Sequence, residues 1–235
     1  MRSKRSRCAW EKRPTSSRSR AAAVCILSAT VYTILGIWVS HRPPSAFDQT
    51  STAFVAHGAV IDVAWIFTAS CLWYVLLPYG IAGVVVAIRS PGWRPRIAIA
   101  IILTLAAWQT SNVLKDVFGR PRPEHWVRVH ESSLSYSSGH AMFAVMVYGL
   151  WAWFVWRSSL PDGVRRTVAP LLALWGLGVL WSRLALGAHY PTDLIGGILL
   201  ATAFIALGYA IVPDSFAAPR ALARLLRPVS SYRNR

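Results

Sequence analysis

Long uncharged apolar stretches constrain this chain more than any other feature of its sequence. They cover residues 21–40, 63–88, 97–114, 141–156, 167–181 and 194–212. A helix needs about 20 residues to cross the hydrocarbon core of a bilayer, so the shorter stretches need polar residues at their ends to complete a crossing. Because 54% of the residues are hydrophobic and only 14% are charged, the sequence predicts an all-α polytopic membrane protein with six transmembrane helices.

The distribution of charge predicts the domain limits and the orientation. We expect residues 1–20 to form a basic tail, residues 21–212 a six-helix membrane domain and residues 213–235 a second basic tail. Nineteen of the 25 Lys and Arg residues lie in these tails and in the turns 89–96 and 157–166. Since basic residues collect on the cytoplasmic side, both tails are predicted to be cytoplasmic, in a bacterial inner (plasma) membrane.

Two other interpretations of the basic residues are less favourable. A cleaved signal peptide has a shorter apolar core and a small-x-small cleavage site, which the sequence before His41 lacks. A formal net charge of +16 would suit nucleic acid, but basic residues in a membrane protein also match anionic lipid. We therefore expect membrane lipids, and no nucleic acid, as partners. Cys8, Cys25 and Cys71 are spaced neither as a zinc site nor as a disulfide framework.

Three polar clusters interrupt the apolar pattern, at residues 115–123, 137–140 and 182–193. The first two lie between the third and fourth apolar stretches, and the last lies between the fifth and sixth. These two connections have the same parity, so all three clusters are predicted to meet on one face of the membrane. The charge distribution makes this the extracytoplasmic face.

Five residues of these clusters suit a phosphate group. Lys115, Arg122 and Arg183 bring three cations to one membrane boundary, where charges are costly and usually functional. The planar fork of arginine matches two phosphate oxygens, and lysine adds a compact charge. Ser138 and Gly139 stand at the predicted N-terminus of a helix, where backbone N–H groups bind anions.

Three further residues provide groups for nucleophilic catalysis. His189 and Asp193 are four residues apart where the last helix begins, so their side chains can lie on one face. Asp193 can accept a proton from one ring nitrogen of His189, which leaves the other nitrogen for in-line attack on phosphorus. His140 can protonate the leaving oxygen and later activate the water that breaks the phosphohistidine.

These residues resemble the type 2 phosphatidic acid phosphatase (PAP2) superfamily, whose pattern is K-x6-R-P, P-S-G-H and S-R-x5-H-x3-D. The first motif runs here from Lys115 to Pro123 and the third from Ser182 to Asp193, and both are complete. The resemblance covers about residues 60–212, including the helix arrangement. It implies a membrane phosphatase with His189 as nucleophile. The other implied roles are acid for His140, orienter for Asp193 and phosphate contact for Lys115, Arg122, Ser138, Gly139 and Arg183.

The second motif departs from the family, because Ser137 stands where the family usually has proline. Proline would stiffen the turn that enters the fourth helix, and serine restores a backbone N–H. We expect an altered turn and a surviving activity. The acidic residues Asp116, Glu124 and Glu131 are scattered, so we predict no metal site and no cofactor.

The sequence therefore predicts an integral membrane lipid phosphatase for a phosphomonoester or diphosphate, of the undecaprenyl diphosphate or phosphatidic acid type. One alternative is a phosphotransferase that passes the phosphate from the same intermediate to another lipid or sugar. A second alternative is a non-catalytic headgroup binder or transporter, which would have no use for the His189–Asp193 pair. Haloperoxidases share the pocket in the superfamily, but the membrane architecture favours a lipid substrate.

Some polar residues have a plainer structural explanation when each is taken alone. A histidine at a helix start, such as His140, is more often a capping or interface residue than a catalyst. Arg120 suits a solvated or headgroup-facing position at least as well as a phosphate contact. Asp48, His57 and Asp62 lie in the first outer loop, and the sequence assigns them no role.

Overall fold

The computed structural model describes residues 13–124 and 131–216, and every regular element within these ranges is helical. The elements are α1 (Arg13–Ser40), α2 (Ala46–His57), α3 (Ile61–Ala69), α4 (Trp73–Arg89), η1 (Pro91–Trp93), α5 (Arg94–Phe118), α6 (Gly139–Phe143), η2 (Ala144–Gly149), α7 (Leu150–Trp156), α8 (Asp162–Ala185), α9 (Pro191–Ile211) and η3 (Pro213–Phe216). The segment η2 is a single π-helical turn that joins α6 to α7.

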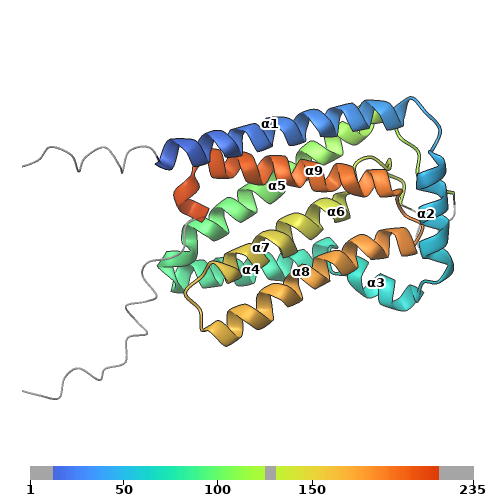
Figure 1. The fold of residues 1–235 in the computed structure, drawn as a ribbon. Helices are drawn as coiled ribbons and strands as arrows, with labels where there is room; N and C mark the ends of the chain where they lie inside the picture. Colours follow the sequence, from blue (N-terminus) through green and yellow to red (C-terminus); the bar gives the residue numbers. More distant parts are fainter. Residues whose placement is uncertain (1–12, 125–130, 217–235) are drawn as a thin grey trace, which may run out of the picture.

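The long helices run side by side along one bundle axis (Figure 1). Within residues 13–124 and 131–216, five helical segments are long and apolar enough to cross a membrane: Ser17–Ser40, Pro91–Phe118, Gly139–Trp156, Asp162–Ala185 and Pro191–Ile211. The shorter apolar helix α4 lies lengthwise with them (Figure 1). Large apolar side chains such as Ile26 and Ile102 are exposed on the outer helix faces, as expected for surfaces that contact lipid. The predicted all-helical membrane architecture is confirmed.

The second apolar stretch, residues 63–88, does not form one continuous helix. It is divided between α3 and α4 by a break at residues 70–72, ahead of Pro78. The Ser70 hydroxyl donates to the Phe67 carbonyl over 2.6 Å, and the Tyr148 hydroxyl donates to the Ser70 carbonyl over 3.1 Å. The two hydroxyl groups thus satisfy carbonyl groups near the end of α3, which allows the helix to be interrupted before α4.

Helix α1 begins at Arg13, eight residues before the predicted start of the first apolar stretch. Part of the predicted basic tail is therefore helical. The remaining tail residues, 1–12 and 217–235, lie outside the described residues.

Helix α9 packs along α1 and also contacts α2, α5 and α6. Small residues make these close contacts possible, since an ideal Cβ on Gly196 would lie 2.5 Å from the Tyr136 ring and one on Gly197 would lie 2.4 Å from the Ser138 carbonyl oxygen. The largest core cluster, which includes Leu103, Met142, Met146, Phe154 and Ala201, packs beside α9.

Helix α2 lies across one end of the bundle (Figure 1). Its N-cap residue Ser45 accepts a hydrogen bond from the Asp48 backbone N–H. The side chains of Phe47 and Phe54 are exposed, whereas Asp48 is fully buried. The helix therefore presents an apolar face outward and a carboxylate inward, as an interfacial helix does.

The three polar clusters converge at the bundle end that α2 covers (Figure 1). This end holds the last turns of α5 and α8 and the first turns of α6 and α9. Gly119 ends α5 in a left-handed conformation with φ 65°, and Gly187 turns the chain after α8 with φ 64°. Glycine adopts such angles without the steric cost of a Cβ, so both turns are sharp enough to keep the clusters together.

Replacing Gly197 with alanine is expected to destabilise the protein by about 1–3 kcal/mol, because the new methyl group overlaps the Ser138 carbonyl and Ala141. Gly80→Ala is the matched control, since nothing lies within 4 Å of its ideal Cβ. Thermal unfolding in detergent micelles measures the difference. Equal melting temperatures for the two variants would contradict the close packing of α9 on α6.

Candidate active site

The ring of His189 has its protonation pattern set by its neighbours. Arg122 Nη1 lies 3.0 Å from His189 Nε2. A guanidinium N–H only donates, so Nε2 must accept and the ring proton of the neutral imidazole must sit on Nδ1. His189 is 1% exposed, and this tautomer leaves the nucleophilic lone pair on Nε2, facing the cations.

Ser135 connects His189 to Asp193, a link that the sequence analysis missed. Its Oγ lies 3.3 Å from His189 Nδ1 and donates to Asp193 Oδ2 over 2.5 Å. The direct separation between Nδ1 and Oδ2 is 3.5 Å, longer than a normal N–H···O hydrogen bond. The expected proximity of His189 and Asp193 is present, but the hydrogen-bonded path between them runs through the serine hydroxyl.

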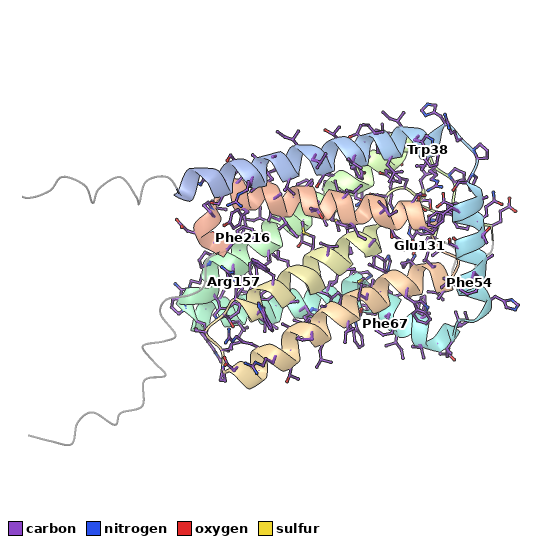
Figure 2. The ribbon with its side chains drawn as sticks, in the orientation of Figure 1. Trp38, Phe54, Phe67, Glu131, Arg157 and Phe216 are labelled. Carbon is purple, nitrogen blue, oxygen red and sulfur yellow. The ribbon has the colours of Figure 1, made fainter. Side chains whose placement is uncertain are left out.

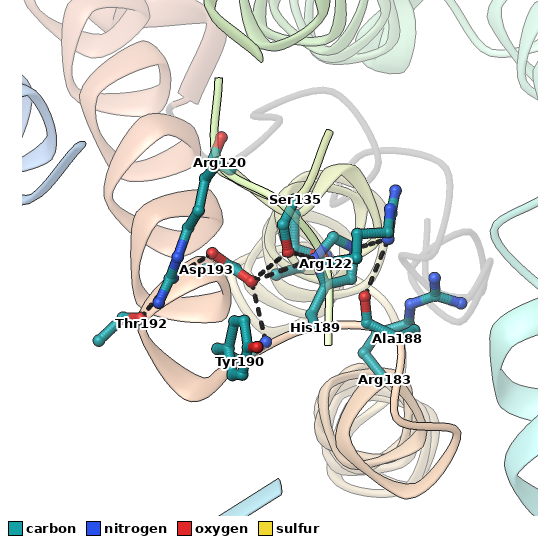
Figure 3. Close-up of polar contacts among 12 residues, drawn as sticks. Arg120, Arg122, Ser135, Arg183, Ala188, His189, Tyr190, Thr192 and Asp193 are labelled. Carbon is teal, nitrogen blue, oxygen red and sulfur yellow. Dashed lines mark hydrogen bonds and ion pairs between the residues drawn. The ribbon is translucent and has the colours of Figure 1, made fainter. Parts of the chain in front are cut away.

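Asp193 is fully buried and receives hydrogen bonds on both oxygens (Figure 3). The Tyr190 backbone N–H donates to Oδ2 over 2.8 Å, and Arg120 Nη1 donates to Oδ1 over 2.5 Å. Burial of a carboxylate is costly unless such partners satisfy it. The three donors hold this carboxylate in one orientation beside the imidazole.

Arg120 and Asp48 form the layer behind Asp193, and neither was assigned this position from sequence. Arg120 Nη2 contacts Asp48 Oδ2 at 2.8 Å, and both side chains are almost inaccessible to solvent. The Thr192 hydroxyl lies 2.9 Å from Asp48 Oδ1. Arg120 is therefore neither solvated nor directed at a headgroup. The position of Arg120 between the motif residues Lys115 and Arg122 was a weak indication that it belongs to the site. Nothing in the sequence indicated that Asp48 lies here.

Arg122 is held by Glu131 and Ser133 and by the turn that precedes α9. Its Nε donates to the Ser133 carbonyl over 2.6 Å, and its Nη1 donates to the Ala188 carbonyl over 2.9 Å. Its Nη2 contacts Glu131 Oε2 at 2.6 Å. Lys115 Nζ lies 3.5 Å from the Ser133 hydroxyl, which brings the lysine to the same loop.

Arg183 completes the group of cations. Its Nη2 contacts Glu131 Oε1 at 2.6 Å, and its Nη1 lies 3.3 Å from the Thr68 hydroxyl. Glu131 thus joins the two predicted phosphate-binding arginines, although its sequence position suggested only a scattered acidic residue.

Helix α6 begins at the same site. Ser138 is its N-cap and accepts a 3.3 Å hydrogen bond from the Ala141 backbone N–H, with Gly139 as the first helical residue. His140 Nε2 is buried and makes no hydrogen bond within the described ranges, while its ring lies within reach of the charges of Arg183 and Lys115. The structure therefore brings together all eight residues singled out from sequence.

Ser137, which replaces the usual proline, points away from this group. Its Oγ lies 3.4 Å from the Tyr32 hydroxyl and 3.4 Å from the Ser111 hydroxyl. The side chain is completely buried. The serine therefore connects the turn to α1 and α5 through polar contacts that proline could not make.

The electrostatics of the site favour a neutral imidazole. Burial lowers the pKa of His189 well below 6.5, and the charges of Arg122, Arg183 and Lys115 lower it further. A histidine must be neutral to act as a nucleophile. Among residues 13–124 and 131–216, no group of three or more His, Cys, Asp or Glu side chains could hold a metal ion.

Comparisons with known proteins place the chain in a family. The model of the PAP2 superfamily matches residues 95–217, which is more than half of the chain. A transmembrane PAP2 type phosphatidylglycerolphosphate phosphatase from Bacillus subtilis has the same fold, with a TM-score of 0.69 over 81% of this chain and 96% of that chain, at 24% identity. The chain belongs to the PAP2 superfamily and is a multi-span membrane protein.

Individual relatives match over part of their length. Phosphatidylglycerophosphatase B from Bacillus subtilis is 38% identical over 38% of this chain and 45% of its own length. The Escherichia coli K12 protein of that name is 36% identical over 44% of this chain and 41% of its own length. A lipid A 1-phosphatase from Rhizobium etli is 30% identical over 37% of this chain and 38% of its own length. The matches thus span less than half of each relative.

The low pKa of His189 can be tested without any substrate. We expect the wild-type imidazole to titrate below pH 6.5, and Arg122→Gln to raise this pKa because it removes one nearby positive charge. NMR titration of isotope-labelled histidines in detergent, assigned with His189→Gln, measures it. Arg157→Gln, at the other end of the bundle, should change nothing. A wild-type value above 6.5 would contradict the described surroundings of the ring.

Proposed function

We propose that this protein is an integral membrane lipid phosphatase that hydrolyses a phosphomonoester or diphosphate through a phosphohistidine on His189. The observation that carries this proposal is the position of the His189 ring between Ser135 and Arg122. Its Nδ1 proton faces Ser135 and Asp193, and its Nε2 lone pair faces Arg122. A nucleophile oriented by a carboxylate and directed at cations suits attack on phosphorus. A protein that only binds headgroups would need the cations alone.

The chemistry proceeds in two displacements. His189 Nε2 forms a bond to phosphorus while the bond to the leaving alcohol or phosphate oxygen breaks, and His140 gives that oxygen a proton. His140 then takes a proton from water, whose oxygen displaces the imidazole and yields inorganic phosphate. The guanidinium groups of Arg122 and Arg183, with Lys115, balance the charge on the equatorial oxygens. The backbone N–H groups at the start of α6 add further donors beside Gly139.

The substrate class is proposed from the site and its relatives together. The site lies at the end of a bundle with lipid-facing apolar sides, so a phosphate can enter it while acyl chains stay in the bilayer. Relatives carry the names phosphatidylglycerophosphatase B and lipid A 1-phosphatase. We propose a lipid phosphomonoester such as phosphatidylglycerophosphate or phosphatidic acid, with undecaprenyl diphosphate as the diphosphate candidate.

The proposed orientation follows the charge at the two bundle ends. Figure 2 labels Glu131 near the end covered by α2 and Arg157 near the opposite end. The turns 89–96 and 157–166, each with three arginines, lie at that opposite end. The positive-inside rule therefore favours an extracytoplasmic site and cytoplasmic termini, in a bacterial inner membrane.

His189→Ala is expected to lower phosphate release by roughly a thousandfold or more, because the covalent step loses its nucleophile. Asp193→Asn should lower it by roughly a hundredfold or more, because the imidazole loses its orienting charge. Release of phosphate from short-chain phosphatidic acid, with EDTA present, measures both effects and tests metal independence. Undiminished turnover by a folded His189→Ala protein would refute the nucleophile, and labelled phosphate found on a lipid or sugar would identify a transferase.

Asp48 and Arg120 are proposed as positioning residues for Asp193. Asp48→Asn keeps an oxygen for Thr192 but removes the charge that holds Arg120, so Asp193 can turn away from Ser135 and His189. We expect kcat to fall about 10- to 100-fold with KM little changed, since small displacements of a catalytic group have such effects. Asp62→Asn, an exposed carboxylate on α3, is the control. An unchanged kcat in folded Asp48→Asn would contradict the positioning role.

A further inference from the structure

The carboxylate of Glu131 lies where the two arginines of the site converge. One oxygen is 2.6 Å from Arg122 Nη2, and the other is 2.6 Å from Arg183 Nη2. The arginine side chains are only 6% and 1% exposed, whereas Glu131 is 32% exposed. The carboxylate thus reaches the buried N–H groups from the solvent side, with a pair of oxygens arranged as two oxygens of a phosphate would be.

Glu131 remains charged in this position. Burial by itself would raise the pKa of this carboxyl, but the positive charges of Arg183 and Arg122 outweigh burial and lower the pKa to about 2. The same guanidinium groups are those assigned to phosphate in the proposed function. Two anions cannot both use the Nη2 groups, because each oxygen would then face another at close range.

Resting on the proposed function, we propose that Glu131 is an affinity-determining residue: its carboxylate competes with phosphate for Arg122 and Arg183 and must leave when phosphate binds. The residue is tethered beside its partners, which gives it an effective concentration in the millimolar range or above. It therefore lowers the affinity for the phosphate of the substrate and for the inorganic phosphate produced. The return of Glu131 to the arginines then helps to expel the product.

The surroundings allow this exchange without dismantling the site. A cavity of about 310 Å³ adjoins Glu131 and is lined by Arg122, Pro123, Glu124, Glu131, Ser132, Ser133 and Leu134. Arg122 keeps its Nε contact with the Ser133 carbonyl and its Nη1 contact with the Ala188 carbonyl when the carboxylate leaves. Thr68 remains beside Arg183. The arginines thus have other anchors, while the carboxylate has space to move.

The exchange also affects the nucleophile. With Glu131 on its Nη2, Arg122 directs Nη1 at the Nε2 lone pair of His189, which must be released for attack on phosphorus. A phosphate that replaces Glu131 offers Arg122 new acceptors on the same side. Binding of phosphate is therefore linked to release of the Nε2 lone pair.

Competition predicts a gain of binding when Glu131 is neutralised. In the wild-type protein, Glu131 raises the apparent Kd of every anion by the same factor. This factor depends on the fraction of molecules in which Glu131 is bound to the two arginines. We expect Glu131→Gln to bind inorganic phosphate and dimethyl phosphate roughly tenfold more tightly, with the same factor for both probes. If Glu131 acted only by charge repulsion, Glu131→Gln would instead give the dianion a larger gain in affinity than the monoanion.

The experiment is a phosphorus NMR titration of the purified full chain in phosphate-free detergent, at about pH 8, where inorganic phosphate is mostly dianionic. Glu124→Gln is the matched control, because it removes an exposed carboxylate from the same cavity wall. Glu131→Ala is the second variant, and thermal unfolding with added phosphate checks that each protein is folded. In kinetics, Glu131→Gln should show a lower KM and stronger inhibition by phosphate.

Weaker or unchanged binding of both probes by folded Glu131→Gln and Glu131→Ala would overturn the proposal, as would an equal gain in Glu124→Gln. If the affinity rises for inorganic phosphate but not for dimethyl phosphate, long-range repulsion explains the effect of Glu131 and the competition proposal is wrong. The titration measures binding and needs no turnover, so it separates the two proposals. If the wild-type protein has no phosphatase activity but Glu131→Gln binds phosphate more tightly, the proposed function is wrong and the competition proposal stands.

Discussion

The candidate site depends on holding one carboxylate in a fixed orientation where water is excluded. Asp193 is completely buried, and it accepts hydrogen bonds from Arg120, Ser135 and the Tyr190 backbone. An isolated buried carboxylate would take up a proton and lose its orienting charge. The buried Asp48 balances the charge of Arg120, so an acidic side chain from α2 supports the start of α9.

A second balance of charge governs the side of the site that faces solvent. Arg122, Arg183 and Lys115 carry positive charge at one end of the bundle, and Glu131 pairs with both arginines. The two carboxylates differ in accessibility: Asp193 is enclosed, whereas Glu131 remains partly exposed. This difference fits the two proposed roles, in which Asp193 orients the proposed nucleophile and Glu131 exchanges with a ligand.

Close packing of small residues makes these contacts possible. Gly196 and Gly197 let α9 approach Tyr136 and the Ser138 carbonyl, and the Ser138 N–H in turn donates to the Asp193 carbonyl over 3.1 Å. The turn that carries His140 is therefore joined directly to the turn that carries Asp193. A bulkier helix surface would separate the two histidines.

The sequence by itself determined the helical membrane class and the meeting of the three polar clusters, because segment length and parity follow from the order of apolar and polar residues. It also provided the eight candidate residues, because their types and spacings form motifs. Only the tertiary structure decided that Ser135 lies between His189 and Asp193, that Asp48 and Arg120 support Asp193, and that Glu131 joins two arginines. The hydrogen bonds between Asp48 and Thr192, for example, join residues 144 positions apart. Since they depend on loop conformation and on how helices pack, no local periodicity or spacing encodes them.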